Sequence, residues 1–296
     1  MTTALLSIVL VNFNMARELP RTLFTLQPPY QQHIRADEVE IIVVDNGSTQ
    51  PVIVPPGIEN IRLLCVENAT HSPVAAINMG LANASTDFIG VMIDGARMVS
   101  PQLLHFALMA KQLHSRAIIS TLGFHLGKEV QTQSVRKGYC QEVEDRLLES
   151  VPWRDNGYEL FNISVFANSS RDGWFLPIAE SNALFMPKSM WHELDGVDMR
   201  FQTPGGGLVN LDTYARACAL ADTELVNILG EGTFHQVHGG IATNQQRADA
   251  SWTLYHAEYM SIRGRPFTRP QKIPMHVGAI RKEHKKSLEL SLRNLT

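Results

Sequence analysis

Short apolar runs, rich in Val and Ile, set the strongest limit on what this chain can fold into. Three of them divide the first hundred residues, at 5–11, 39–44 and 88–93, and an aspartate follows the second and the third. Runs this short and continuous are typical of strands buried on both faces, as in a parallel sheet. Further runs at 61–66, 117–122, 183–186 and 225–229 indicate additional strands.

Segments with helical spacing alternate with these runs. Apolar side chains recur at helical intervals over 19–26 and over 74–81, behind Pro73. Further helices are expected at 103–110, 142–149, 188–194, 210–221 and 249–262. Strands that alternate with helices predict an α/β fold with a Rossmann-like, mostly parallel central sheet and helices on both of its faces.

Composition excludes several other classes of protein. Hydrophobic residues make up 44% of the 296, enough for a sizeable core, and 26 basic against 29 acidic side chains give a net charge of −3. Such a balance offers no basic field for nucleic acid. Three scattered cysteines indicate a reducing compartment. No run approaches the roughly 18 apolar residues of a membrane span, so we expect a cytoplasmic protein without an integral membrane segment.

Polar residues stand where three of the predicted strands end. Asn12, Phe13 and Asn14 follow the first run, Asp45 follows the second, and Asp94 follows the run at 88–93. In open parallel sheets, ligands bind beyond the carboxyl ends of the strands. Any one of these residues could instead cap a helix or form a turn, but three strand ends together favour a binding site. Neither a GxGxxG nor a GxxxxGK[ST] phosphate loop is present.

The order of the motifs carries a family resemblance. Residues 7–14 (SIVLVNFN), 41–49 (IIVVDNGST), 76–80 (AINMG) and 88–94 (FIGVMID) follow one another as in family 2 glycosyltransferases of the A-type fold, which the chain resembles. The resemblance continues more loosely through 181–187 and 194–201. It implies a nucleotide-sugar-binding half at 1–100, an acceptor-side half of the same fold at 101–245, and a C-terminal helical and basic tail at 246–296.

The resemblance also implies roles for the strand-end residues. Phe13 would stack on the donor base, with Asn12 beside it, and Asp45 would accept a hydrogen bond from an imide N–H. Asp94 stands at the first aspartate of the family's metal motif, where a divalent cation, Mn²⁺ or Mg²⁺, neutralises the donor diphosphate. The donor-binding residues implied are Asn12, Phe13, Asn14, Asp45, Asn78, Asp94 and Arg97.

Several positions depart from the family pattern. The metal motif usually reads Asp-x-Asp, but Ala96 replaces its second aspartate here. Arg97, which follows, either offsets phosphate charge or faces solvent. The family's Glu-Asp pair, which often holds the general base, aligns with 209–210, where no carboxylate stands. Asp212 is the nearest carboxylate and the predicted base; otherwise it is an ordinary helix N-terminal aspartate, and Glu180 or Glu231 is the next candidate.

Two histidines fall in a glycine-rich segment at 230–240, predicted as a loop after a strand. Relatives often place a late histidine on the metal, and imidazoles three residues apart could do so here. We therefore expect Asp94, His235 and His238 as metal ligands, with His238 favoured because a double glycine follows it. The glycines could equally serve only a tight turn.

The resemblance implies a glycosyltransferase that moves a sugar, expected to be UDP-linked, from a nucleotide-sugar to a hydroxyl acceptor in glycan or polysaccharide synthesis, with inversion. The alternative is a catalytically inactive nucleotide-sugar-binding protein on the same fold, because the metal and base motifs are incomplete. Expected partners are the donor and a saccharide or lipid-linked acceptor, without nucleic acid. A homodimer stays open.

Overall fold

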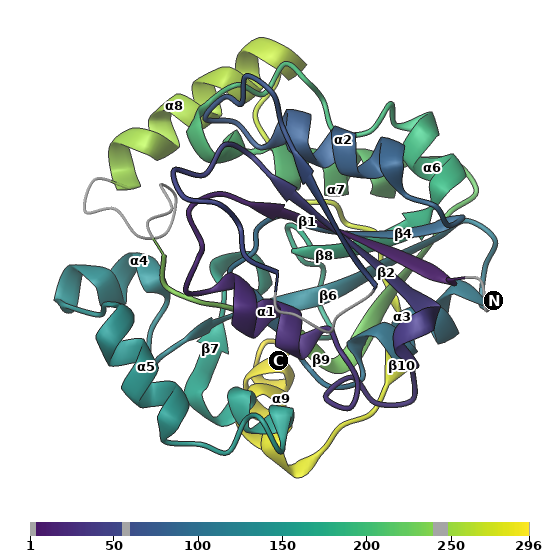
Figure 1. Ribbon diagram of the computed structural model, residues 1–296. Coiled ribbons are helices and arrows are strands. Elements are labelled where there is room, and N and C mark those ends of the chain that lie inside the picture. Colours follow the sequence, from purple (N-terminus) through teal and green to yellow (C-terminus); the bar gives the residue numbers. More distant parts are fainter. Residues whose placement is uncertain (1–3, 55–59, 239–247, 296) are drawn as a thin grey trace.

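In the part of the chain that the structure describes, a ten-stranded sheet forms the centre (Figure 1). The structure is a computed structural model that describes residues 4–54, 60–238 and 248–295. The strand order is β10-β9-β6-β8-β4-β1-β2-β3, with β5 paired to β9 and β7 to β6. The strands are β1 Leu6–Asn12, β2 Val39–Asp45, β3 Ile61–Cys65, β4 Phe88–Met92, β5 Arg97–Val99, β6 Ala117–Leu126, β7 Ser164–Phe166, β8 Ala183–Pro187, β9 Glu224–His235 and β10 Met275–Gly278.

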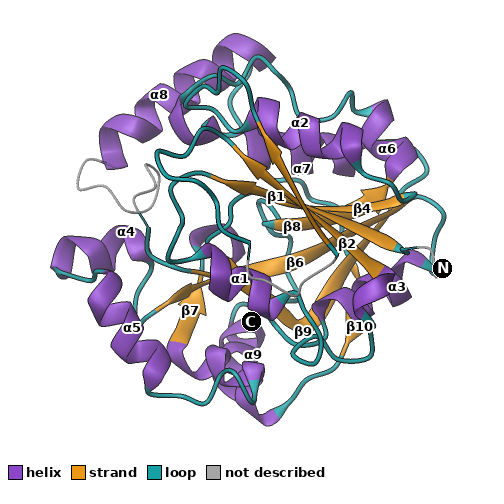
Figure 2. Cartoon of the chain, viewed as in Figure 1, coloured by secondary structure: helices purple, strands orange, loops and turns teal. Residues whose placement is uncertain are grey.

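Helices cover both faces of this sheet (Figure 2). The α-helices are α1 Leu19–Thr25, α2 Val74–Asn83, α3 Leu103–Lys111, α4 Gln131–Ser134, α5 Gln141–Glu149, α6 Lys188–Glu193, α7 Val209–Ala219, α8 Ala248–Arg263 and α9 Lys285–Arg293. Short 3₁₀ turns lie at Ala36–Glu38, Val135–Lys137, Gly157–Ile163, Asn168–Ser170, Pro204–Gly206 and Lys282–His284. Among the described residues, no helix is both long and apolar enough to cross a bilayer.

The apolar runs become strands because both of their faces are buried. In β1, Val9 and Val11 belong to a core cluster that includes side chains of α2, α6 and α7. Ile8 and Leu10 point the other way, into a cluster with side chains of α1 and α3. Alternate residues of a strand face opposite sides of a sheet, so continuous apolar runs are what this sandwich between two helical layers requires.

Strand directions confirm the predicted fold class. The pairs β1–β2, β1–β4, β2–β3, β6–β9 and β9–β10 are parallel. The central strand β8 runs antiparallel to β4 and β6. The sheet is therefore mostly parallel, with helices on both faces, and β1, β2 and β4 direct their carboxyl ends to the same edge.

The segment predicted as a loop at 230–240 is largely strand, which corrects that interpretation. β9 is 12 residues long and ends at His235. Gly230 has a φ of +77°, and the register against β6 shifts between Ser120 and Leu122. A glycine with positive φ lets a strand take up an irregularity and continue. His235 is thus held in the sheet, and the double glycine after His238 lies outside the described residues.

Candidate active site

The first two strand ends meet in a network of side-chain hydrogen bonds. Asn12 and Asp45 are paired residues of β1 and β2, and Asn12 Nδ2 donates to Asp45 Oδ1 over 3.2 Å. Ser48 donates to the same carboxylate through its hydroxyl, at 2.5 Å, and its backbone N–H. The Oδ1 atom of Asn12 is buried and has no hydrogen-bond partner among the described residues. That leaves a free acceptor at the carboxyl edge of the sheet.

Asn14 joins the two loops that border this network. Its φ is +53°, a left-handed conformation that asparagine tolerates better than most residues. Its Oδ1 accepts from the backbone N–H of Thr49 over 2.8 Å, and its own N–H donates to the hydroxyl of Ser48. Phe13, between the two asparagines, is 42% exposed. Phe13 is therefore an exposed aromatic ring next to the Asn12–Asp45 pair in sequence and in the fold.

Asp94 is held next to the same pair by a tight turn. A Cβ atom on Gly95 would lie 3.3 Å from Asn12 Oδ1, so the turn packs directly on that residue. Asp94 Oδ1 accepts from the backbone N–H of Ala96 over 3.1 Å. The three strand ends singled out in the sequence are thus brought together.

Arg97 faces inward, so the solvent-exposed alternative for this residue is wrong. It is 8% exposed, and its Nε donates to Asp94 Oδ2 over 2.9 Å. Strand β5 places it opposite His235 of β9. Its Nη1 is buried with no hydrogen-bond partner in the described structure. A buried guanidinium with an unused donor can hold a further anion, such as a phosphate oxygen.

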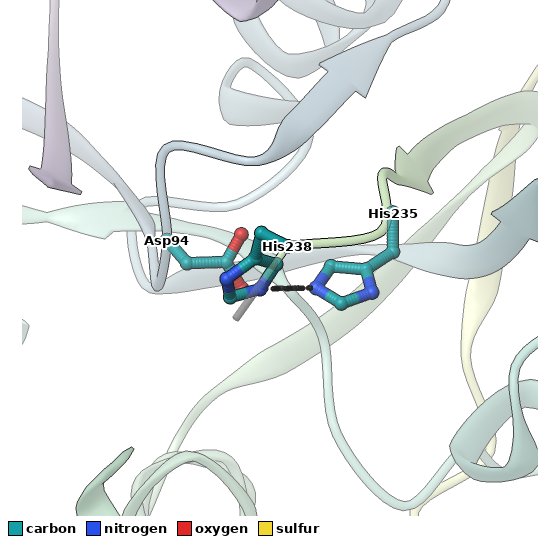
Figure 3. Close-up of side chains that lie close together, drawn as sticks. All are labelled: Asp94, His235 and His238. Carbon is teal, nitrogen blue, oxygen red and sulfur yellow. Dashed lines mark hydrogen bonds and ion pairs between the residues drawn. The ribbon is translucent and has the colours of Figure 1, made fainter. Parts of the chain in front are cut away.

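Asp94, His235 and His238 form a cluster whose ligand atoms all lie within 4.8 Å of one another (Figure 3). The two Nε2 atoms are 3.1 Å apart, and His235 Nε2 lies 3.8 Å from Asp94 Oδ2. Two imidazoles and one carboxylate suit a divalent transition metal, and Mn²⁺ also accepts carboxylate and water ligands. The donor set therefore fits Mn²⁺, one of the two cations that the resemblance implied.

Burial keeps both histidines neutral. The pKa of His235 is far below its usual range, because the ring is desolvated and because Arg97 lies nearby. Desolvation also lowers the pKa of His238, although the charge of Asp94 opposes that shift. Neutral imidazole is the form that binds a metal. The electrostatics thus agree with the ligand geometry.

Residues that sequence reasoning missed hold the segment bearing His238. The backbone N–H of Val237 donates to Glu144 Oε2 over 2.8 Å, and its carbonyl accepts from Arg17 Nη1 over 3.1 Å. Arg17 also bonds to Glu144 Oε1. Both the N–H and the carbonyl group of Val237, the residue before His238, are therefore held by hydrogen bonds. No sequence motif connects residues 17, 144 and 237. Residues 17 and 144 could have been noticed in the sequence only as charged side chains in a region of mixed polarity.

Comparisons with known proteins give matches among solved structures alone. No family model matches the chain, and no curated protein matches it either. Among solved structures, the mannosyltransferase PcManGT from Pyrobaculum calidifontis, in complex with GDP-Man and Mn²⁺, is 12% identical with a TM-score of 0.54, over 99% of this chain and 70% of that one. TarS 1–349 from S. aureus, in complex with UDP-GlcNAc, is 13% identical with a TM-score of 0.53, over 86% and 66%.

A longer TarS structure from S. aureus matches at 12% identity and a TM-score of 0.51. This chain has a glycosyltransferase fold. The likeness confirms the fold that the motif order predicted. The match covers 86% of this chain but only 40% of that TarS chain. This chain therefore corresponds to less than half of that protein.

Asn78, predicted to bind donor, uses its amide inside the glycosyltransferase fold. Its Nδ2 donates to the carbonyl of Val197, and its Oδ1 accepts from the N–H of the same residue, both over 2.9 Å. Gly196 has a φ of +65°, and a Cβ there would lie 2.3 Å from Asn78 Oδ1. Both ends of the amide thus take part in joining α2 to a loop, and donor binding by Asn78 stays a prediction.

Asp212, the predicted base, forms hydrogen-bonded ion pairs with two arginines. It is 1% exposed, and Arg263 donates to both of its oxygens over 2.6 Å. Arg216, one turn along α7, donates to Oδ2 over 2.9 Å. Both oxygens of this carboxylate are therefore bonded to guanidinium groups. These contacts tie α7 to the end of α8.

Glu180 lies at the edge of the sheet where the other site residues gather. It precedes β8, whose first residue, Ala183, pairs with Met92 of β4, so Glu180 and Asp94 flank adjacent strand ends. Asn210, at the family's usual base position, donates to Glu180 Oε2 over 2.6 Å. Glu231 is fully buried in β9 and accepts from Tyr158 and the backbone of Gln102. Of the three carboxylates, Glu180 has the fewest competing contacts.

Proposed function

We propose that this chain is a glycosyltransferase that moves a sugar from a nucleotide-sugar to a hydroxyl acceptor. The observation that carries the proposal is the cluster of Asp94, His235 and His238 at the carboxyl edge of the sheet, beside the Asn12–Asp45 pair. A divalent cation in such a site neutralises diphosphate charge as the leaving group departs. Neighbours of the same fold hold UDP-GlcNAc or GDP-Man, which supports a nucleotide-sugar donor.

Each side chain has a stated task in this proposal. Phe13 stacks on the donor base. Asp45 accepts a hydrogen bond from an imide N–H of that base, with Asn12 beside it. Asp94, His235 and His238 hold Mn²⁺ or Mg²⁺, and Arg97 adds positive charge toward the diphosphate. The expected donor is UDP-linked, and the acceptor is a saccharide or a lipid-linked saccharide.

For the base that deprotonates the acceptor, we propose Glu180 ahead of Asp212. Asn210 orients one carboxylate oxygen of Glu180, and no cationic side chain is bonded to that carboxylate in the described structure. In-line attack from that side, opposite the leaving diphosphate, inverts the anomeric configuration. Asp212 could act only if Arg216 and Arg263 released it.

A second candidate function is nucleotide-sugar binding without catalysis. The ion pair between Arg97 and Asp94, together with Ala96 at the missing second aspartate, favours it. In that case Arg97 would take the place of the cation, and the chain would hold its ligand without splitting it.

Release of free nucleoside diphosphate from a panel of UDP- and GDP-sugars distinguishes the two functions. With Mn²⁺ present, we expect release from at least one donor. Asp94→Asn should lower the rate by more than the roughly 10–100-fold that loss of an outer-shell partner costs. The exposed Asp155 offers the matched control Asp155→Asn. Donor binding in calorimetry without release of nucleoside diphosphate would favour the binding protein. Turnover that a chelator leaves unaffected would favour a metal-independent enzyme.

A further inference from the structure

The side chain of Gln131 makes two contacts with one residue of the candidate metal site. Gln131 opens α4 and is fully buried. Its Nε2 donates to the carbonyl of His235 over 2.9 Å, and its Oε1 contacts the ring Nδ1 of the same histidine. A carbonyl oxygen can only accept, so the amide must direct its NH₂ group there and its oxygen at the ring.

This orientation decides which nitrogen of His235 carries hydrogen. An amide oxygen cannot donate, so Nδ1 must supply the hydrogen of that contact. In a neutral imidazole, the other nitrogen then keeps its lone pair. That nitrogen is Nε2, which lies 3.8 Å from Asp94 Oδ2 and 3.1 Å from His238 Nε2.

His238 supplies the hydrogen between the two rings when no ion is bound. With the Nε2 of His235 as an acceptor, the hydrogen on the 3.1 Å contact belongs to His238 Nε2. For both rings to bind one ion, His238 must carry its hydrogen on Nδ1 instead. The tautomer of His235 is therefore set in advance by the protein, whereas that of His238 changes on binding.

Gln131 is itself fixed by the same strand pair. Its backbone N–H donates to His125 Nδ1 over 2.9 Å, and His125 in β6 is the register partner of His235 in β9. The helix that bears Gln131 is thus anchored to the neighbour of the residue it orients. Buried side chains held in this way act as outer-shell partners that orient metal ligands.

We propose that Gln131 is a positioning residue that holds His235 in the Nδ1–H tautomer, so that its Nε2 lone pair is directed at the site formed with Asp94 and His238. The proposal rests on the metal site of the proposed function. It explains why a polar side chain is buried at this point of α4. It also makes His235 the preformed ligand of the pair, although His238 is the more favoured one from the sequence.

Titration of the full chain with Co²⁺, followed by visible absorption, measures the effect without any turnover. Gln131→Met keeps the length of the side chain and removes both hydrogen bonds, and we expect Co²⁺ affinity to fall about 10–100-fold. The matched control is Gln133→Met, the same change at an exposed position of α4, which should bind as the unaltered chain does. Gln131→Glu restores an acceptor for Nδ1–H, so its affinity should exceed that of the Met variant.

Three outcomes would overturn this proposal and leave the metal site itself standing. One is unchanged Co²⁺ affinity in a folded Gln131→Met variant, and another is equal weakness of the Met and Glu variants, which would show a packing role alone. The third is a hydrogen on Nε2 of His235 in long-range ¹H–¹⁵N spectra of the unaltered chain, a measurement that needs no variant to fold. If the unaltered chain binds no Co²⁺ at all, the metal site of the proposed function fails and this proposal falls with it.

Discussion

At the scale of single residues, the role of each carboxylate depends on which groups are already bonded to it. Asp94 is paired with Arg97 and lies beside two neutral imidazoles, and Asp45 is surrounded by hydroxyl and amide donors. Asp212 carries a full set of guanidinium contacts. Glu180 bonds only to the amide of Asn210 among the contacts that the structure describes. Glu180 is therefore the carboxylate that we propose for proton transfer, because no guanidinium group is bonded to it in the described structure.

The contrast between two substitutions tests that reasoning. Glu180→Gln removes the base and keeps a partner for Asn210, so turnover should fall about 10²–10⁴-fold while donor affinity holds. Asp212→Asn removes the charge that Arg216 and Arg263 bind, so the melting temperature should fall while turnover per folded molecule is kept. Turnover and thermal unfolding are measured on one preparation of each variant. A rate loss in Asp212→Asn at an unchanged melting temperature would restore Asp212 as the base.

At the scale of elements, β9 connects the core to the site. Its irregularity at Gly230 lets the strand continue to His235, and β5 pairs along its last residues to set Arg97 opposite that histidine. The backbone at Gly230 approaches another chain segment closely, since a Cβ there would lie 2.0 Å from the carbonyl oxygen of Ala279. The position of His235 thus depends on a residue without a side chain.

Replacing Gly230 should reveal that dependence. Gly230→Ala adds both the cost of a positive φ and a backbone clash, so we expect a loss of more than about 2 kcal/mol in the free energy of unfolding. Gly138→Ala is the control, because Gly138 has a φ of +91° with nothing within 4 Å of the added Cβ, and it should cost only about 1 kcal/mol. Urea unfolding measures both. Equal losses would mean that the close approach at Gly230 is easily relieved.

At the scale of the whole molecule, buried charge links the sheet to the C-terminal segment. Glu231 of β9 accepts from Tyr158, whose ring lies 4.3 Å from the guanidinium of Arg281. Burial raises the pKa of Glu231 to about 7 from an ordinary 4.5, against the opposing effect of its hydrogen bonds. The folded protein therefore retains a proton that the unfolded chain loses between these two pH values.

Stability should consequently fall as the pH rises from about 4.5 to about 7 and then level off, as far as Glu231 contributes. A shift of this size corresponds to about 3 kcal/mol over the whole range. Glu231→Gln cannot ionise and should lack this part of the pH dependence. Urea unfolding of both proteins at pH 5 and pH 7.5 gives the comparison. Parallel pH profiles for the two proteins would show that Glu231 is ionised throughout or that its proton is held equally when unfolded.

The sequence by itself determined the fold class and the edge of the sheet at which the site lies. Alternating apolar runs and helical spacings report local burial, and Asn12, Asp45 and Asp94 stand at strand ends, which are local features too. Only the tertiary structure decided which side chains meet. Arg97 lies opposite His235 because β5 pairs with β9. The charge of Asp212 is compensated because Arg263 of α8, 51 positions along the chain, bonds to it. Such pairings depend on contacts between distant segments, and no local pattern of residues records them.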